Sequence, residues 1–545
     1  MLRRWLILAL ATPLMAPGGE SDAAENLAAR RVRAHVTFLA DDLLEGRAAG
    51  TRGHELAGAY VAAQFAAAGL RPSGADGTYR QTVNLVESTR DYTGARFIVR
   101  TRGQPETVLD PLSDFLAAPV PSVERAEIHG AAVFAGFGVH APEQGYSDLE
   151  GADLEEKIAV VFFGAPAILP ATARAHYSDR DTKARELARR GAIGMITVNP
   201  PAEETRRPWA TVLAGSRFPA MTLIGPDETL VDVIPEIRIG ASVSASGTAK
   251  LFARSPRRFA DAVAAAERNE PQSFPLGVEL TLAANSTQRR VSSHNVLALL
   301  PGADPSIARE YVVLTSHLDH LGIGTAVNGD TIYNGAIDNA IGVASLIAAA
   351  HYLEENGPRP RRSILFAAVT AEEKGLLGAR HLSRTPPANS RFVANINVDA
   401  GPFFAPLRAV IGMGKEHTTL GAVFERVANK LNWAIRADPR PEDRRFVRSD
   451  QYSFVLEGVP ALRLLAAAES TDPKSDLAEI DRAFWRDRYH KPNDDLQHRI
   501  DFDSAGAFAV LLAEVARAVA NDAQTPAWLP GDFFGNRFGK RDGAK

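Results

Sequence analysis

The sequence predicts an α/β fold with a mostly parallel or mixed sheet flanked by helices. In the second half of the chain, strand-like apolar runs occupy residues 311–316, 363–369 and 392–398. Helical patterns at residues 340–355 and 376–383 alternate with these runs. The strands are apolar on both faces, which is typical of a sheet covered by helices on both sides.

The first half of the chain predicts additional structure around this core. Residues 31–44 and 54–68 have helical periodicity, and a glycine-rich joint separates them. A strand-like region begins near Tyr79. From about Val120 to Phe252, short apolar strands ending in glycine alternate with helical stretches. This block contains no ligand-like cluster, and we interpret it as an inserted domain.

The N-terminus, MLRRWLILALATPLMAPGG, predicts a cleaved secretory signal. Arg3 and Arg4 precede twelve apolar residues from Trp5 to Ala16, a stretch too short to span a bilayer as a helix. A buried N-terminal helix is the alternative, but the prolines would break it. We expect cleavage between Ala16 and Ala24, and a periplasmic or secreted protein.

Composition excludes several classes of protein. The net charge of -4 comes from 61 basic and 65 acidic residues that are mixed along the chain, so nucleic acid is not expected as a partner. The chain has no cysteine, which rules out disulfides and a lipid-anchoring cysteine. No later segment has eighteen consecutive apolar residues, so no membrane span is expected.

Five residues in the second half have contexts that suit metal ligands. In chain order they are His317 (SHLDH), Asp338 (GAIDNA), Glu373 (TAEEKG), Asp399 (NINVDAG) and His490 (RYHKPND). Three of them follow predicted strands, and ligands of open α/β sheets bind beyond the carboxyl ends of the strands. Two imidazoles and three carboxylates are able to hold two divalent ions with one carboxylate shared.

Neighbouring residues add chemistry to this set. Asp338 is our choice for the shared carboxylate, because its Gly/Ala/Asn-rich turn allows close backbone approach. We expect Asp319 to accept the second imidazole N–H of His317 and fix its tautomer. Glu372 directly precedes Glu373, so their side chains diverge at a strand end, and Glu372 is placed to act as a general base. Taken singly, each pattern is more often a helix cap, a solvated surface pair or a loop.

The other histidines are expected to be surface or core residues. They are His320, His351, His381, His417 and His498.

The blocks TSHLDHLG, NGAIDNAIGVA, VTAEEKGLLGA, NINVDA and YHKPNDD resemble the M28 family of zinc peptidases, the aminopeptidase-type members of the zinc-exopeptidase clan. The inserted block, with AGFGVHAPEQGYSDLEG and IAVVFFG, resembles the protease-associated domain common in that family. The resemblance implies an N-terminal lead-in (24–115), a protease-associated domain (116–255) and a catalytic domain (256–525). The expected signal peptide (1–23) precedes them, and a C-terminal tail (526–545) follows.

Carried over by position, the resemblance implies two Zn²⁺ ions, although another divalent metal is possible. It implies one ion on Asp338, Glu373 and His490, and a second on His317, Asp338 and Asp399. Glu372 would be the general acid/base, Asp319 a supporting partner, and Tyr489 would polarise the substrate carbonyl or stabilise the oxyanion.

Gln451 and Arg448 stand beside the implied pocket. Gln451 stands where histidine is common in the family, which leaves local substrate contacts open. Arg448 is a candidate for the pocket, although it also belongs to an arginine-rich run that starts at Arg436.

The leading hypothesis is an exported di-zinc aminopeptidase that releases N-terminal residues from peptides. A carboxypeptidase of the same fold is the main alternative, with the arginine-rich run 436–448 gripping a C-terminal carboxylate. A non-catalytic binding protein is a third reading, weakened by the complete ligand set. Oligomeric state, side-chain preference and the role of the inserted domain stay open.

Overall fold

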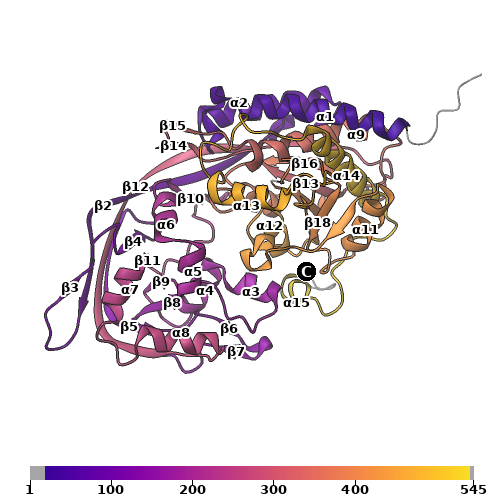
Figure 1. Cartoon of the computed structure of the whole chain (residues 1–545). Helices are drawn as coiled ribbons and strands as arrows, with labels where there is room; N and C mark the ends of the chain where they lie inside the picture. Colours follow the sequence, from indigo (N-terminus) through magenta and orange to yellow (C-terminus); the bar gives the residue numbers. More distant parts are fainter. Residues whose placement is uncertain (1–18, 400, 540–545) are drawn as a thin grey trace, which may run out of the picture.

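The computed structural model describes residues 19–399 and 401–539. Figure 1 shows two lobes, a larger one that contains the C-terminal half of the chain and a smaller one formed mainly by the segment before it. Helices and strands alternate as the sequence predicts, so the α/β fold class is confirmed. Most of the predicted signal peptide lies outside the described residues, and the first described helix begins at Gly19.

The larger lobe is built on a mixed sheet with the strand order β19-β18-β20-β17-β13-β16-β12. Strands β16, β13, β17 and β20 are mutually parallel, whereas β12 and β18 run antiparallel to their neighbours β16 and β20. The strands are β12 (Phe274–Leu300), β13 (Glu310–His317), β16 (Ser363–Val369), β17 (Arg391–Val398), β18 (Ala409–Met413), β19 (Ala434–Arg436) and β20 (Ala461–Ala466).

Helices cover both faces of this sheet because successive strand residues point to opposite sides. On one face, Val312 and Leu314 pack in the same core as the N-terminal helices and α9, α11 and α14. On the other face, Val313 packs with α10 and α12. The helices are α1 (Gly19–Leu39), α2 (Arg52–Ala67), α9 (Ile341–Glu355), α10 (Leu377–Arg384), α11 (Leu420–Lys430), α12 (Gln451–Leu456), α13 (Leu477–Asp487) and α14 (Phe502–Asn521).

One helical stretch of the described residues, Ala336–Glu355, is long and apolar enough to cross a membrane. It includes α9, and 89% of the apolar 18-residue window within it is buried inside the protein. Its apolar character is therefore accounted for by its place in the core of the larger lobe.

The smaller lobe continues the same sheet in the order β12-β5-β8-β9-β11-β4. Strands β5, β8, β9 and β11 are parallel, and β4 closes the edge antiparallel to β11. The elements are β4 (Phe115–Pro119), β5 (Arg125–Phe134), β8 (Ile158–Phe162), β9 (Gly194–Val198), β11 (Ile239–Val243), α3 (Ala171–Tyr177), α4 (Arg180–Ala188), α5 (Pro201–Arg206), α6 (Trp209–Gly215), α7 (Ala245–Phe252) and α8 (Phe259–Glu267).

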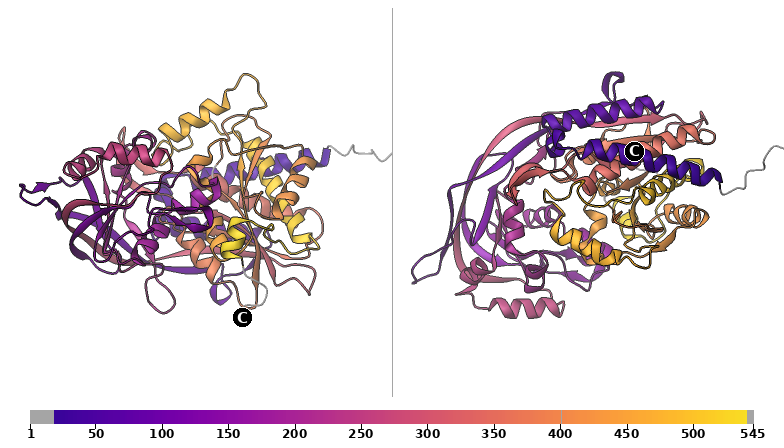
Figure 2. Two further views of the ribbon diagram at one scale, coloured as in Figure 1. Left: turned by 90° about the horizontal axis from the view of Figure 1, so that it is seen from below. Right: turned by 45° about the horizontal axis from the view of Figure 1, so that its top comes forward.

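Two long antiparallel strands connect the lobes. β2 (Arg80–Arg100) and β12 pair along most of their length, with a register shift between Ala283 and Asn285. One end of this ribbon contributes Phe97 and Leu280 to the core of the smaller lobe, and the other contributes Val296 to the core of the larger lobe. The ribbon forms the arc along one side of the molecule in Figures 1 and 2.

The remaining elements are short. They are β1 (Arg71–Pro72), β3 (Thr107–Val108), β6 (His140–Ala141), β7 (Tyr146–Ser147), β10 (Ala220–Leu223), β14 (Gly322–Val327), β15 (Asp330–Tyr333), α15 (Phe533–Phe538) and the turns η1 (Asp42–Arg47), η2 (Ala75–Gly77), η3 (Pro142–Gln144), η4 (Ala336–Ala340), η5 (Pro441–Asp443) and η6 (Arg445–Val447). The assignment of residues 116–255 to a protease-associated domain stays a prediction.

Candidate metal centre

The predicted ligands gather at the carboxyl edge of the larger lobe's sheet. His317 is the last residue of β13, Glu373 follows β16, and Asp399 follows β17. Because these three strands are adjacent and parallel, their carboxyl ends lie side by side. The fold thus brings together residues that are far apart in the sequence.

Asp338 reaches this edge from the short turn η4, which precedes α9. Gly335 begins the turn with φ 61°, and a Cβ there would lie 2.2 Å from the backbone oxygen of Asp338. Glycine is therefore required at this close approach. The buried carboxylate of Asp494 accepts hydrogen bonds from the backbone N–H groups of Ile337 (3.1 Å) and Asp338 (3.0 Å), which fixes the turn.

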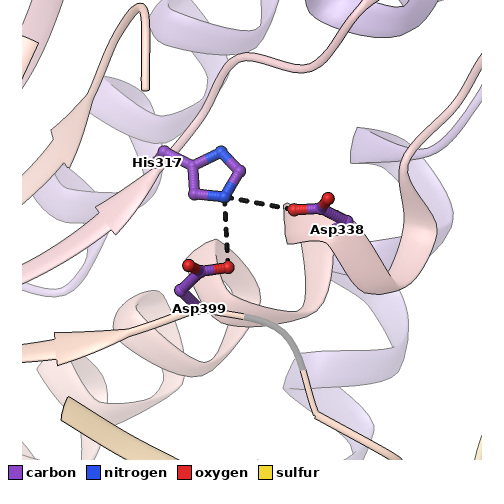
Figure 3. A group of neighbouring side chains, drawn as sticks. All are labelled: His317, Asp338 and Asp399. Carbon is purple, nitrogen blue, oxygen red and sulfur yellow. Dashed lines mark hydrogen bonds and ion pairs between the residues drawn. The ribbon is translucent and has the colours of Figure 1, made fainter. Parts of the chain in front are cut away.

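Three of the predicted ligands converge on one point (Figure 3). The Nε2 atom of His317 lies 3.2 Å from Oδ1 of Asp338 and 3.3 Å from Oδ1 of Asp399. All three side chains are buried. The side chain of Arg463 neutralises part of this charge, because its Nη2 atom lies 3.1 Å from Oδ2 of Asp399.

A second group forms on the other oxygen of Asp338. The Nε2 atom of His490 lies 3.2 Å from Oδ2 of Asp338 and 3.2 Å from Oε2 of Glu373. The Nδ1 atom of His320 lies 2.7 Å from Oε1 of Glu373, so the two oxygens of that carboxylate face different histidines. Asp338 belongs to both groups.

The spacing of these atoms fits a tetrahedral metal ion. Zinc bonds of about 2.0–2.1 Å to nitrogen and oxygen separate tetrahedral ligand atoms by about 3.3–3.4 Å. The four separations between histidine nitrogens and carboxylate oxygens are 3.2 or 3.3 Å. Buried carboxylates at such short range also need a compensating cation. The donor set and its geometry therefore fit zinc.

The expected role of the Asp319 carboxylate is wrong in one respect. The Nδ1 atom of His317 lies 3.0 Å from the backbone oxygen of Asp319, not from its side chain. The Asp319 carboxylate instead accepts hydrogen bonds from the backbone N–H groups of Glu372 (3.1 Å) and Glu373 (3.4 Å). A carboxylate takes two donors that would otherwise be unsatisfied in the protein, while a carbonyl oxygen is sufficient to fix the imidazole.

Glu372 faces the same cleft as the ligands. Burial, together with the negative charges of Asp399, Glu373 and Asp450, raises the pKa of Glu372 well above its ordinary value, although His317 opposes the shift. A carboxyl group with a raised pKa beside a metal centre is suited to take and return a proton.

The cleft has a volume of about 860 Å³ and lies between the two lobes. The larger lobe contributes Glu372, Tyr489 and His490, and the smaller lobe contributes residues of α3 and α4. Tyr489 stacks on the ring of His490 with a centroid distance of 3.8 Å. The role expected of Tyr489 toward the substrate carbonyl stays a prediction.

Gln451 and Arg448 occupy different environments. Gln451 is fully buried, and its Oε1 atom accepts a hydrogen bond of 2.8 Å from Asn397 of β17. Its side chain therefore supports the sheet. Arg448 is exposed and lines the cleft.

Several residues around the centre are not among the predicted site residues. His320, expected to be an ordinary surface or core residue, is fully buried against Glu373. Its position in SHLDH, three residues after His317, was the available signal. Asp494, which fixes the turn of Asp338, is a second such residue, and its position in the YHKPNDD block close to His490 was the signal for it. Asp450 is fully buried in the motif next to Arg448, and burial raises its pKa to about 8, with Asp399 and Asp319 adding to the shift.

Comparisons with known proteins agree with this centre. A family model described as peptidase family M28 matches residues 295–516, which include all five predicted ligands. The "Probable leucine aminopeptidase 2" of Aspergillus fumigatus is 28% identical over 250 residues, covering 44% of this chain and 46% of that protein. The mouse (Mus musculus) protein "Aminopeptidase NAALADL1" is 34% identical over 145 residues, covering 25% of this chain and 18% of that protein.

The chain therefore spans less than half the length of these curated relatives. Among solved structures, the aminopeptidase from Aneurinibacillus sp. strain AM-1 covers 94% of this chain and 97% of its own, with 18% identity and a TM-score of 0.51. This likeness extends over both lobes and supports the fold.

Proposed function

Because the chain belongs to peptidase family M28, we propose that it is a zinc-dependent aminopeptidase that removes N-terminal residues from peptides. The observation that carries this proposal is the position of Asp338, whose two oxygens each lie 3.2 Å from a different histidine. A carboxylate in that position is suited to bridge two ions. The similar proteins named as aminopeptidases support removal of residues from the N-terminus instead of the C-terminus of the peptide.

The side chains divide into two ligand groups. His317 and Asp399 would hold one Zn²⁺ ion, Glu373 and His490 would hold the other, and Asp338 would bridge them. When bound, the ions supply Lewis acidity for the substrate carbonyl and lower the pKa of a bound water.

The protein's own groups would handle the proton and the substrate. Glu372 takes the proton from the attacking water and passes it to the leaving amine. Asp319 holds Glu372 through its backbone N–H, and His320 directs the second oxygen of Glu373 toward His490. Tyr489, which lines the cleft and stacks on His490, would polarise the substrate carbonyl or stabilise the oxyanion.

A carboxypeptidase is the second candidate, and Arg448 is the observation that favours it. Other arginines of the run are engaged elsewhere, since Arg436 pairs with Glu469 and Arg440 with Asp481. Within the described part of the chain, Arg448 lines the cleft without an ion pair. It is therefore available to a substrate carboxylate.

The experiment that separates the two compares one short peptide with a free and with an acetylated N-terminus, using zinc-loaded mature protein. An aminopeptidase cleaves only the free form. Release of the C-terminal residue from the acetylated form would reverse the polarity, and no hydrolysis of either peptide would contradict both candidates.

We further propose that the protein is exported to the periplasm or secreted. The support is the charged and apolar N-terminal sequence, which has the pattern of a cleaved signal. N-terminal sequencing of the protein recovered from cell fractions tests this, with a new terminus between Ala16 and Ala24 as the expected result.

A further inference from the structure

The C-terminal segment, residues 527–538, is attached to the larger lobe by backbone and side-chain contacts. The backbone N–H of Thr419 donates to the oxygen of Ala527 (2.9 Å), and the indole N–H of Trp528 donates to the oxygen of Gly458 (2.9 Å). Phe534 is fully buried against rings of the larger lobe. The segment is thus an integral part of the folded protein.

The same segment also contacts the smaller lobe. Phe533 and Phe538 of α15 lie against the ring of His176, with centroid distances of 5.7 and 5.6 Å. The guanidinium of Arg537 donates a 3.2 Å hydrogen bond to the hydroxyl of Tyr177. Both His176 and Tyr177 belong to α3, so α15 contacts both lobes. Figure 1 shows it below the larger lobe and beside α3.

His417 links all three parts of the chain. Its Nδ1 atom lies 2.6 Å from the carboxylate of Asp532 in the C-terminal segment, and its Nε2 atom lies 3.3 Å from the hydroxyl of Thr172 in the smaller lobe. With the proton on Nδ1, the ring donates to Asp532 and accepts from Thr172.

A second hydrogen bond between the lobes lies next to the contacts of His417. The Nδ1 atom of His176 is 2.7 Å from the hydroxyl of Tyr452, and both side chains are buried. Tyr452 also packs against Phe534 of the C-terminal segment.

These contacts form part of the wall of the active cleft. His176, Tyr177, Tyr452, Arg537 and Phe538 line the same cleft as Glu372 and His490. The ribbon of β2 and β12 joins the lobes elsewhere, away from α15 (Figures 1 and 2). Three sets of contacts therefore join the lobes around the cleft. The long strands connect them covalently, and the ion pairs of Asp232 with Arg380 (3.0 Å) and Arg384 (2.9 Å) of α10 connect them without the C-terminal segment. The third set is formed by the C-terminal segment and the side chains around it.

We propose that the C-terminal segment is a latch, a segment that holds the two lobes together. By doing so it restricts the cleft to short peptides, and this effect on specificity rests on the proposed peptidase function. A cleft of about 860 Å³ falls in the range of ligand-binding clefts and cavities, roughly 300–1,000 Å³. Opening the latch side would remove the wall made by α15 and admit longer chains.

A distance measurement tests the latch without requiring turnover. Ile168 in the smaller lobe and Ile480 in α13 are exposed, and the chain has no native cysteine to interfere with labelling. Spin labels on Ile168→Cys and Ile480→Cys report the distance between the lobes. The variants are Asp532→Ala and a chain that ends at Pro526, and the controls are Asp503→Ala and a chain that ends at Gly539.

We expect one narrow distance in the parent and the controls, and a distribution about twofold broader in both latch variants, because small interfaces between domains permit relative motion. An unchanged distribution in folded Asp532→Ala and in the truncated chain would overturn the latch. If the truncated chain does not fold, the Asp532→Ala result decides.

Turnover tests the second half of the proposal. The ratio of kcat/KM for a long unstructured peptide to that for a tripeptide should rise about fivefold or more in Asp532→Ala. An unchanged ratio despite a broader distance would overturn the role in specificity. Absence of hydrolysis by the zinc-loaded parent would instead contradict the proposed function and leave the distance result intact.

Discussion

The Asp319 carboxylate accepts a 3.1 Å hydrogen bond from the backbone N–H of Glu372. The two residues follow β13 and β16, which are adjacent strands, so the bond ties together two loops at the carboxyl edge of the sheet. Asp319 therefore sets the position of Glu372, the proposed general base. Asp319 belongs to the same motif, SHLDH, as the proposed metal ligand His317.

Substitution of Asp319 by alanine should lower kcat by about 10–100-fold, the usual cost of losing a group that supports a metal site. Zinc should remain bound, because His317 contacts the backbone oxygen of Asp319, which the substitution preserves. Asp319→Asn keeps an acceptor oxygen and should lose less. Steady-state kinetics with metal analysis checks this, and an unchanged kcat in Asp319→Ala would refute the positioning role.

Glu372→Ala should abolish most turnover, with kcat lower by about 10²–10⁴-fold, because no other group would move the proton. Metal content should stay unchanged, since Glu372 is not among the ligands. Asp503→Ala, which removes an exposed carboxylate of the same lobe, serves as the control. Retained activity in Glu372→Ala would remove this residue from the mechanism.

Arg47→Met should destabilise the protein and weaken metal binding together. The buried guanidinium of Arg47 donates to the backbone oxygens of Leu318 (3.0 Å), Asn334 (2.6 Å) and Gly335 (3.1 Å), next to two of the ligands. Leaving these acceptors unsatisfied should cost roughly 3–5 kcal/mol.

Thermal unfolding and zinc content measured on the same sample check the Arg47 prediction. Arg52→Met, which removes an exposed arginine paired with Glu45, is the matched control. A Tm equal to that of the parent would contradict the predicted role of Arg47.

Metal binding should release protons at neutral pH. Burial alone would lower the pKa of both histidines, but in the metal-free protein Glu373 and Asp338 raise the pKa of His490 to about 10, and Glu372, Asp338 and Asp399 raise that of His317 well above its usual value. Both rings are then protonated at pH 7, and a metal ion must displace those protons.

The apparent zinc affinity should therefore increase as pH rises from 6 toward 9, and decrease in acid. Calorimetric titrations in two buffers with different ionisation enthalpies count the released protons. An affinity that does not change with pH would show that the histidines are already neutral before metal binds.

The sequence predicted the parts of the site that depend on order along the chain. His317, Glu373 and Asp399 each follow an apolar strand, and parallel strands place such residues at one edge. Asp338 was predictable from the turn that needs Gly335. The apolar runs predicted the adjacent strands β13, β16 and β17 and the helices α9 and α10, whereas β12, β18 and β20 of the same sheet were not predicted.

The parts that depend on contacts across space were not predictable. His320 and Asp494 act through partners that lie 53 and 157 residues away in the sequence. The acceptor for His317 was predicted as the wrong atom of Asp319, because a residue pattern does not distinguish a side-chain oxygen from a backbone oxygen. Arg47 reaches carbonyl groups more than 270 residues away, and no local pattern marks such a contact.

The shared ribbon has a consequence for how the protein folds. Residues 274–285 of β12 pair with β5 of the smaller lobe on one side and, over much of this stretch, with β2 on the other. Removal of residues 116–255 would leave this end of the ribbon paired only with the two-residue strand β3, and so small a sheet is marginally stable in water. Folding of the smaller lobe is thereby coupled to that of the larger one, so excision of the inserted block would yield an aggregation-prone edge instead of a minimal peptidase.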